Sequence, residues 1–306
     1  CRSLRLRGST ARRAWGEYAA ASNAISCTHR RAGELVGGIG EGGRPQPDFP
    51  VVGTMAIMFE ELAADFARDG AVCARNAVPP ELLGRVAIDI DANLAAPSNL
   101  AQVASGDDDP GRFVEDFCNW RRFSAYLELA NAMAPLAGAL MGSNTVRLYH
   151  DHLLVKEAGT QQTTPWHQDQ PYYDVEGRDV ISMWLPVDAV PRESTLEFVA
   201  GTHLGPWLMP RTFMQRESKW FPEGSLADVP AVDDDRDSFP IIGWALQPGD
   251  AVFFHALALH GSRGSATRRR VISIRYLGDD AHRVERRWRC SPPMPADATF
   301  PLLTPA

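Results

Sequence analysis

Short apolar runs separated by turns fill the second half of the chain, and this pattern most constrains what the chain can fold into. Segments rich in glycine, proline and aspartate separate the runs, and no helical pattern lies between them. Their positions are 146–148, 153–155, 180–184, 196–199, 251–254 and 271–276. Many short strands without intervening helices are typical of antiparallel sandwiches and barrels. We therefore predict a mainly β fold with flanking helices, a double-stranded β-helix (jelly roll, cupin-like), whose mouth would hold a small-molecule site.

Helical spacing occurs before these strands. Apolar residues recur every three or four positions over residues 59–66, which predicts an amphipathic helix ended by Gly70. A short strand is expected at 71–74, a second helix from Pro79 to about Leu94, and a third over 123–140. We expect these helices to support the sheet and to carry no chemistry.

The first 54 residues differ in composition from the rest. Residues 1–33 contain many arginines but a single acidic residue, Glu17, and glycine- and proline-rich stretches follow. An Arg-rich, acid-poor start is typical of an organelle transit segment. A second interpretation is that the natural protein starts at Met55, the first methionine, and that the residues before it are an extension. We favour this second interpretation. We expect residues 1–54 to be disordered and residues 55–306 to form a single domain.

A pair of potential metal ligands, His167 and Asp169, follows one of these turns. In an extended segment, residues two apart project to the same side, so the imidazole and the carboxylate would face one site. His260 is a candidate third ligand. Two histidines and one carboxylate on one face of a metal form the facial arrangement of non-heme Fe(II) oxygenases. A His-x-Asp pair alone is more often a hydrogen-bonded pair in a sheet, so the neighbouring segments matter.

The segments around His260 favour a metal site. A Pro-Gly-Asp turn at 248–250 and an apolar run at 251–254 lead to His260, and Arg269 opens the strand that follows. An oxygenase that uses a 2-oxo acid needs a fixed cation for the distal carboxylate of that co-substrate. Arginine suits this role because its planar, permanently charged guanidinium binds a carboxylate through two hydrogen bonds.

Together these motifs resemble the phytanoyl-CoA dioxygenase (PhyH-like) family of Fe(II)/2-oxoglutarate-dependent oxygenases. The resemblance extends from about Phe59 to Asp280. It is carried by Trp166-His167-Gln168-Asp169, by the Pro-Gly-Asp turn before Val252-Phe253-Phe254-His255, by His260-Gly261-Ser262 and by Arg269-Arg270-Val271-Ile272-Ser273.

The resemblance implies a role for each of these residues. His167, Asp169 and His260 match the iron ligands, Arg269 matches the residue that binds the far carboxylate of 2-oxoglutarate, and Trp184 matches a residue that lines the co-substrate pocket. The implied activity is an Fe(II)- and 2-oxoglutarate-dependent dioxygenase that uses O2, hydroxylates a small organic substrate and releases succinate and CO2. Retention of Asp169 favours hydroxylation, because the related halogenases lack this carboxylate.

Several residues compete for these roles. His255 lies five residues before His260, so the two would face opposite sides of a straight strand. Arg270 remains an alternative to Arg269, and Arg275 is expected to form a structural ion pair rather than to contact substrate. Hydrogen-bonded strand or loop residues are the simpler interpretation of His150, His152 and His203.

Three loops bear on substrate placement and access. Residues 192–195 read Arg-Glu-Ser-Thr where relatives commonly carry Asn-Gly, which affects the geometry of the turn. Residues 263–265 read Arg-Gly-Ser where relatives often have an asparagine, so substrate placement there could differ. The polar insertion 211–238 is a candidate lid, and its acidic run 233–235 is expected to be a solvated loop.

The composition of the chain bears on its possible partners. A net charge of −7 gives no reason to expect nucleic acid or an anionic membrane as partner, and no apolar run is long enough to span a bilayer. Five scattered cysteines suggest reduced thiols in the cytoplasm. No sequence feature specifies an oligomeric state or the substrate. Two other classes stay open: a zinc- or manganese-dependent jelly-roll hydrolase or isomerase, and a non-catalytic metal-binding relative.

Overall fold

The computed structural model describes residues 52–212, 219–295 and 297–304, and residues 59–306 form one compact unit. The N-terminal extension expected at 1–54 lies almost wholly outside the described residues, so its role stays a prediction. The helices are α2 (Val52–Asp69), α3 (Pro80–Ala95) and α4 (Ser124–Met141), and the 3-10 turns are η1 (Gln170–Tyr172), η2 (Arg192–Ser194), η3 (Thr202–Leu204), η4 (Val232–Asp234) and η5 (Arg236–Ser238).

Strands make up most of the regular structure, and every pair of adjacent strands is antiparallel. They are β1 (Ala71–Ala74), β2 (Gln102–Val103), β3 (Phe113–Phe117), β4 (Val146–Lys156), β5 (Thr164–His167), β6 (Val175–Glu176), β7 (Val180–Pro186), β8 (Leu196–Val199), β9 (Ile241–Ile242), β10 (Ala251–His255), β11 (His260–Ser262), β12 (Arg269–Leu277), β13 (His282–Arg283) and β14 (Leu302–Thr304).

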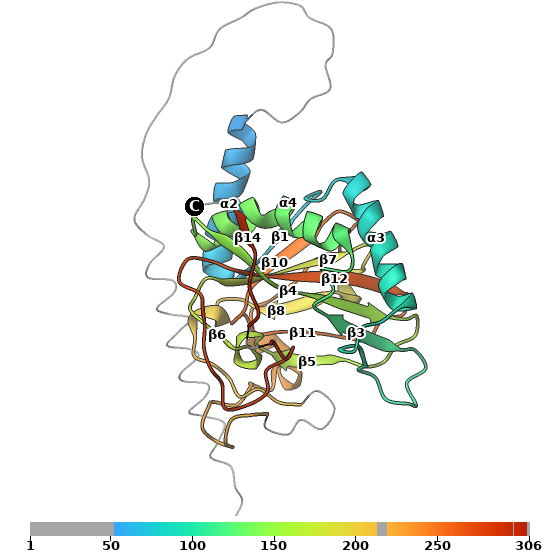
Figure 1. Ribbon diagram of the computed structural model, residues 1–306. Coiled ribbons are helices and arrows are strands. Elements are labelled where there is room, and N and C mark those ends of the chain that lie inside the picture. The colour runs from blue at the N-terminus through green and yellow to red at the C-terminus, as the bar shows by residue number, and fades with distance from the viewer. Residues whose placement is uncertain (1–51, 213–218, 296, 305–306) are drawn as a thin grey trace, which may run out of the picture. The chain divides into compact units, whose positions relative to one another are not determined.

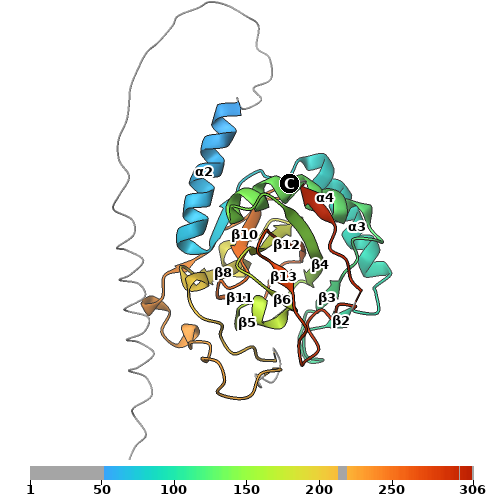
Figure 2. The ribbon, with the colours of Figure 1, turned by 60° about the vertical axis from the view of Figure 1, so that its left-hand side comes forward.

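Two sheets face each other across the interior. The large sheet has the order β1-β10-β7-β12-β4-β3-β2, with β14 also paired to β4, and the small sheet has the order β5-β11-β8-β9. Helices α3 and α4 cover the outer face of the large sheet, and the small sheet lies on its other side (Figure 1). In Figure 2 the large sheet curves from β10 through β12 and β4 to β3, opposite β8, β11 and β5. The predicted double-stranded β-helix with flanking helices is confirmed.

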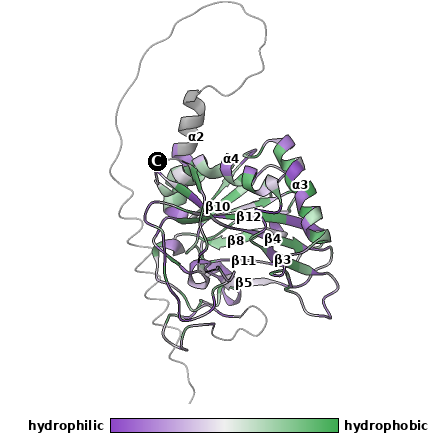
Figure 3. Cartoon of the chain, in the orientation of Figure 1, coloured by the Kyte–Doolittle hydropathy of each residue, from purple (hydrophilic) through white to green (hydrophobic). Residues whose placement is uncertain are grey.

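The alternation of side chains along β12 divides the interior into two layers. Ile272, Ile274 and Tyr276 belong to the core under the helices, whereas Val271 packs in the core between the sheets. Successive strand residues point to opposite faces, so Arg269 and Arg275 lie on the same side as Val271. The central strands are mostly apolar, which Figure 3 shows as green along the sheets. Apolar packing therefore holds rigid the strand that brings two arginines into the interior.

Local sequence signals explain where the helices begin and end. Helix α3 follows Pro79 and starts with Pro80, because proline has no N–H to leave unsatisfied in the first turn. Helix α4 ends at Gly142, whose φ of 70° lies in the left-handed region that glycine adopts without strain. One prediction was wrong in detail, since the runs at 146–148 and 153–155 form one continuous strand, β4.

The insertion 211–238 is only partly described by the structure. The described residues of the insertion 211–238 carry the short turns η4 and η5, and the rest of the candidate lid, 213–218, lies outside the described residues. Across the described ranges, no helix is both long and apolar enough to cross a membrane.

Candidate metal centre and cavity

The two histidines of the site converge because their strands pair. Strands β5 and β11 are antiparallel neighbours, and His167 lies directly opposite His260. Residues directly opposite each other in an antiparallel pair project to the same face. The ring centroids are 4.2 Å apart, and both side chains are buried. Phe254 and Phe198 pack against the His260 ring, at centroid distances of 4.6 and 5.8 Å, and fix its orientation.

Asp169 completes the group, although not in the way that the sequence suggested. Strand β5 ends at His167, and Asp169 has helical angles (φ −71°, ψ −47°) at the start of η1. The expectation of an extended His-x-Asp segment was therefore wrong. Nevertheless Asp169 Oδ1 lies 3.6 Å from His167 Nε2 and 3.8 Å from His260 Nε2. One ligand atom from each residue lies within 4.8 Å of the other two. The turn therefore brings the carboxylate to the same site as the two imidazoles, as an extended strand was expected to do.

Backbone hydrogen bonds fix the orientation of both histidine rings, so that Nε2 of each ring faces the centre of the site. His167 Nδ1 lies 2.8 Å from the carbonyl oxygen of Pro165, and His260 Nδ1 lies 2.9 Å from that of Ala258. A carbonyl accepts, so each Nδ1 carries the proton and each Nε2 presents a lone pair to the centre. Burial lowers the pKa of His260 to about 3, which keeps this ring neutral as a ligand must be.

The second oxygen of Asp169 is held by the protein. Ser182 Oγ donates to Asp169 Oδ2 at 3.0 Å, and Arg275 Nη2 donates to the same oxygen at 3.4 Å. Arg275 also donates through Nε to the Tyr173 hydroxyl at 3.1 Å. Burial alone would raise the pKa of Asp169, but Arg275 and the two histidines lower it well below its usual value. The carboxylate is therefore ionised, with Oδ1 turned to the centre, and the ion pair expected of Arg275 is formed.

These donors fit a ferrous ion. Neutral imidazole nitrogen and ionised carboxylate oxygen are the donors of the facial site, and here all three groups are buried. Metal bonds of about 2.1 Å that meet at right angles place the donors about 3.0 Å apart, below the observed 3.6 and 3.8 Å. Small movements of the three side chains would therefore close the site around one ion.

A cavity of about 280 Å³ adjoins the three candidate ligands. Its apolar wall includes Leu154, Trp184, Leu196 and Phe254. Arg269 lines the same cavity and is buried, with its guanidinium 5.4 Å from the centroid of the Trp184 ring. Arg269 Nη1 donates to the carbonyl of Ser194, whereas Nε has no hydrogen-bond partner among the described residues. Trp184 and Arg269, which the resemblance assigned to the co-substrate pocket, thus lie next to each other at the cavity.

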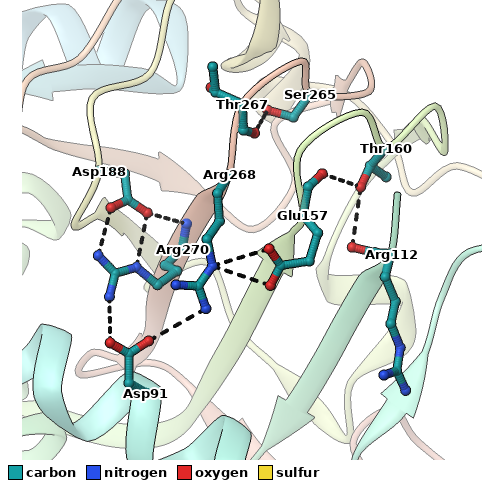
Figure 4. A network of polar contacts seen from close by, with 9 residues as sticks. All are labelled: Asp91, Arg112, Glu157, Thr160, Asp188, Ser265, Thr267, Arg268 and Arg270. Atoms are coloured by element: carbon teal, nitrogen blue, oxygen red, sulfur yellow. Dashed lines mark hydrogen bonds and ion pairs between the residues drawn. The ribbon is translucent and has the colours of Figure 1, made fainter. Parts of the chain in front are cut away.

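The neighbouring arginines point away from the cavity. Arg270 pairs with Asp188 at 2.7 Å and with Asp91 at 2.8 Å, and Arg268 pairs with Asp91 and with Glu157 on the same outer surface (Figure 4). Strand alternation explains the difference, because adjacent residues of β12 face opposite sides. Among the three consecutive arginines, only Arg269 reaches the cavity.

The competing histidines have other partners. His255 ends β10, and its Nδ1 accepts a hydrogen bond from the Leu257 N–H at 3.0 Å. Its ring packs against His203, with the centroids 5.4 Å apart. His255 and His260 do not share a straight strand, because a turn separates β10 from β11. His150 and His152 line the cavity but do not belong to the group of three ligands.

Sequence reasoning missed several polar residues at the cavity. The buried carboxylate of Glu115 lies 3.2 Å from His152 Nε2 and accepts a hydrogen bond from Gln102 Nε2 at 2.9 Å. Burial raises the pKa of Glu115, but His152, together with Gln102 and His167, acts in the opposite direction, and the net effect lowers the pKa. Lys156 and Ser182 were missed as well. Glu115 and Lys156 are charged residues in or at the end of apolar runs, and that signal was present in the sequence.

Removing Arg275 should weaken metal binding. In Arg275→Met, Asp169 Oδ2 loses its cationic partner and keeps the Ser182 hydroxyl, so the carboxylate is held less firmly toward the centre. Loss of such an orienting contact typically costs about 10- to 100-fold in metal affinity. Equilibrium dialysis against Fe(II) under anaerobic conditions measures the change. The matched variant Arg283→Met, which breaks the ion pair with Asp174 outside the cavity lining, should bind Fe(II) as the wild type does. Equal affinity in both variants would show that Arg275 does not position Asp169.

The fold and this site define a class of protein. Two sheets that enclose two histidines and one carboxylate beside a small-molecule cavity are the arrangement of double-stranded β-helix, non-heme Fe(II) oxygenases. Residues 66–271 match the phytanoyl-CoA dioxygenase (PhyH) family, and the chain belongs to that family. It is an Fe(II)/2-oxoglutarate-dependent oxygenase, which confirms the resemblance seen in the sequence.

The relatives cover much but not all of the chain. A probable phytanoyl-CoA dioxygenase of Caenorhabditis elegans is 27% identical over 248 residues, which make up 74% of this chain and 77% of the worm protein. The peroxisomal phytanoyl-CoA dioxygenase of Rattus norvegicus is 26% identical over 230 residues, 72% of this chain and 62% of the rat protein. For the human protein of that name, 26% identity over 180 residues covers 56% of this chain and 51% of that protein.

Solved structures share the fold at lower identity. The epimerase SnoN, in complex with Fe3+, alpha ketoglutarate and nogalamycin RO, has a TM-score of 0.63 and 21% identity over 81% of this chain and 99% of its own. The carbocyclase SnoK has a TM-score of 0.62 and 20% identity over 80% of this chain and 96% of its own. EctD from S. alaskensis, with 2-oxoglutarate and 5-hydroxyectoine, has a TM-score of 0.53 and 19% identity over 77% of this chain and 79% of its own.

Proposed function

We propose that this oxygenase hydroxylates a small organic substrate, with His167, Asp169 and His260 as the iron ligands and Arg269 as the residue that binds the distal carboxylate of 2-oxoglutarate. One observation carries the proposal. The three ligand atoms converge on a cavity into which a buried arginine also points, and no carboxylate in the described part of the chain pairs with that arginine.

Each residue has a defined task in this proposal. The two Nε2 atoms and Asp169 Oδ1 would hold the metal, and bound Fe(II) would supply the activation of dioxygen that side chains cannot perform. Arg269 would orient 2-oxoglutarate by forming charge-assisted hydrogen bonds to its distal carboxylate. Trp184 and Phe254 would keep water from the reacting groups. Asp169 occupies the ligand position that related halogenases leave open for halide, which supports hydroxylation.

The experiment is an Fe(II)/2-oxoglutarate assay of succinate release against a metabolite library, with mass spectrometry of the product. Hydroxylation predicts succinate release and a product that gains one oxygen atom. A product with an unchanged formula would indicate isomerisation, and a product that lacks two hydrogen atoms would indicate an oxidative ring closure. Turnover without O2 and a 2-oxo acid would favour a hydrolase or isomerase. Metal binding without any succinate release would favour a non-catalytic relative.

We also propose that residues 55–306 form a single oxygenase domain and that the protein acts in the cytoplasm. Support for the first is the family match at 66–271 and the compact unit that starts at Phe59. Support for the second is the odd number and wide spacing of the five cysteines; Cys73, Cys118 and Cys290 are free thiols. The curated rat and human relatives are named as peroxisomal, so fluorescence microscopy of the tagged protein would decide between the two compartments.

A further inference from the structure

Polar side chains line much of the cavity besides Arg269. Lys219, His150 and His152 are among them, and none of the three has a task in the proposed reaction. Polar groups that face an apolar ligand lose their hydrogen bonds to water and gain none in return, which is unfavourable. The polar part of the lining therefore bears on the class of substrate that the cavity accepts.

Lys219 is a half-buried cation of the lining. Its Nζ lies 4.2 Å from the centroid of the Trp220 ring and 5.2 Å from that of the Tyr172 ring. Tyr172 in turn packs edge-on against His167 at a centroid distance of 6.0 Å, so a single ring separates the ammonium group from a candidate metal ligand. Among the described residues, no carboxylate forms an ion pair with Lys219. Burial lowers the pKa of Lys219 and the charge of Glu115 opposes this shift, so a bound anion would further stabilise the ammonium form.

The charges of the lining also favour an anionic substrate. Three side chains of the lining are positive and two are negative, namely Lys219, Arg269, Arg275, Asp169 and Glu115. Bound Fe(II) and the two carboxylates of 2-oxoglutarate would cancel each other, which leaves one positive charge in excess. Arg275 is paired with Asp169, and Arg269 would bind the co-substrate. Lys219 is therefore the cation that remains for the substrate.

Two histidines of β4 offer hydrogen bonds to a ligand. His150 is buried and lies opposite Arg275 in the sheet, and its Nδ1 has no hydrogen-bond partner among the described residues. Burial lowers the pKa of His150 well below its usual value, so the neutral ring has one donor and one acceptor. His152 Nε2 lies 3.2 Å from Glu115 Oε1, and the Phe117 ring stacks on the imidazole at 4.0 Å, which fixes its orientation. A buried nitrogen without a partner is costly, and a polar group of the substrate would remove that cost.

Resting on the proposed function, we propose that the prime substrate is a small polar acid, whose anionic group pairs with Lys219 and whose hydroxyl or amino groups hydrogen-bond to His150 and His152. The cavity of about 280 Å³ also has to hold the co-substrate, which favours a small molecule. A long apolar acyl chain would leave all three side chains without a partner.

The test sorts candidate substrates by charge. Thermal shift followed by calorimetry, both under anaerobic conditions, measures binding to the protein loaded with Fe(II) and 2-oxoglutarate. The probes are small hydroxy acids and amino acids, their carboxamides, which lack the anionic group, and acyl thioesters such as octanoyl-CoA. We expect the compounds that bind to be acids, and each should bind more tightly than its carboxamide. The same acids should stimulate succinate release.

Variants of the lining separate substrate recognition from a structural role. Lys219→Gln should raise the dissociation constants of the acids that bind by about tenfold or more and leave that of 2-oxoglutarate within about twofold. Lys219→Arg, which keeps the charge, should restore most of the lost affinity. His150→Phe keeps a flat ring without its nitrogens, and it should weaken binding of the acids by about threefold or more.

Arg121→Gln is the matched control, because Arg121 is an exposed cation that also lies over an aromatic ring, 4.5 Å from the centroid of Trp120, and it does not line the cavity. It should leave every dissociation constant unchanged. Tighter binding of carboxamides or acyl thioesters than of the acids, or failure of every acid to bind, would overturn the proposal. So would unchanged binding of the acids in Lys219→Gln, or equal weakening of the acids and of 2-oxoglutarate. Absence of 2-oxoglutarate binding in the wild type would instead contradict the proposed function itself.

Discussion

Asp169→Ala is expected to abolish 2-oxoglutarate turnover, with a loss of at least about a thousandfold, or about 4 kcal/mol of transition-state stabilisation. Asp169 supplies the single anionic donor of the three-ligand group, and its Oδ1 lies within 4 Å of both histidine Nε2 atoms. Alanine removes that donor and leaves Arg275 as a buried cation without its partner. Both changes reduce affinity for a divalent cation. Succinate release at saturating Fe(II) and 2-oxoglutarate measures the effect.

The control for this variant is Asp188→Ala. Asp188 pairs with Arg270 on the outer surface and contributes nothing to the cavity (Figure 4). The variant should retain turnover close to that of the wild type, with a modest change in thermal stability. Full activity of Asp169→Ala would remove this residue from the ligand set. Equal loss in both variants would indicate a general effect of losing a carboxylate rather than a role in metal binding.

Arg269→Leu is expected to raise the KM for 2-oxoglutarate by about 100-fold, since truncating one side of a buried charged contact costs about 2–5 kcal/mol. The guanidinium of Arg269 lies over the Trp184 ring at the cavity, and its Nε has no partner in the part of the chain that the structure describes. Its loss should affect co-substrate binding more than binding of the metal. Initial rates over a range of 2-oxoglutarate concentrations, together with Fe(II) dialysis, separate the two effects.

Arg270→Leu is the matched control for Arg269→Leu, because the two arginines are adjacent in β12 and face opposite sides. The KM for 2-oxoglutarate should stay within about twofold of the wild-type value in Arg270→Leu, although loss of two exposed or half-buried ion pairs costs up to about 1 kcal/mol of stability each. The opposite outcome, a raised KM in Arg270→Leu alone, would assign the co-substrate to the other face of the strand and refute the proposed site.

Much of the fold and the identity of the ligand candidates could be predicted from the sequence. Strand periodicity and turn residues indicated the β-helix, and the histidine and aspartate motifs indicated the facial group. His167 and His260 come together, as the sequence suggested, because the pairing of their strands places both side chains on one face. The reasoning for Asp169 failed, since a single turn after β5 replaced the expected extended backbone. Short-range conformation of this kind depends on tertiary packing, which a two-residue spacing does not record.

The residues that support the ligands could not be found in the same way. Ser182 and Lys156 lie outside the motifs, on strands that pair with the distant strand β12. Its register places Ser182 of β7 opposite Arg275, which shares Asp169 Oδ2 with it, and Lys156 of β4 opposite Arg269. A β-bulge between Arg275 and Tyr276 further shifts the register of β12 on β4. Pairing registers between distant strands are set by the packing of the whole sheet, so the supporting residues become visible only in three dimensions.

Fe(II) dialysis under anaerobic conditions, on the wild type and on single alanine variants of His167, Asp169 and His260, tests the central claim most directly. The account predicts one tightly bound iron per wild-type chain and a loss of affinity of at least about 100-fold in each variant, because all three side chains hold one ion. Tight binding of one iron to any of the three variants would contradict it, since that residue would then lie outside the metal site.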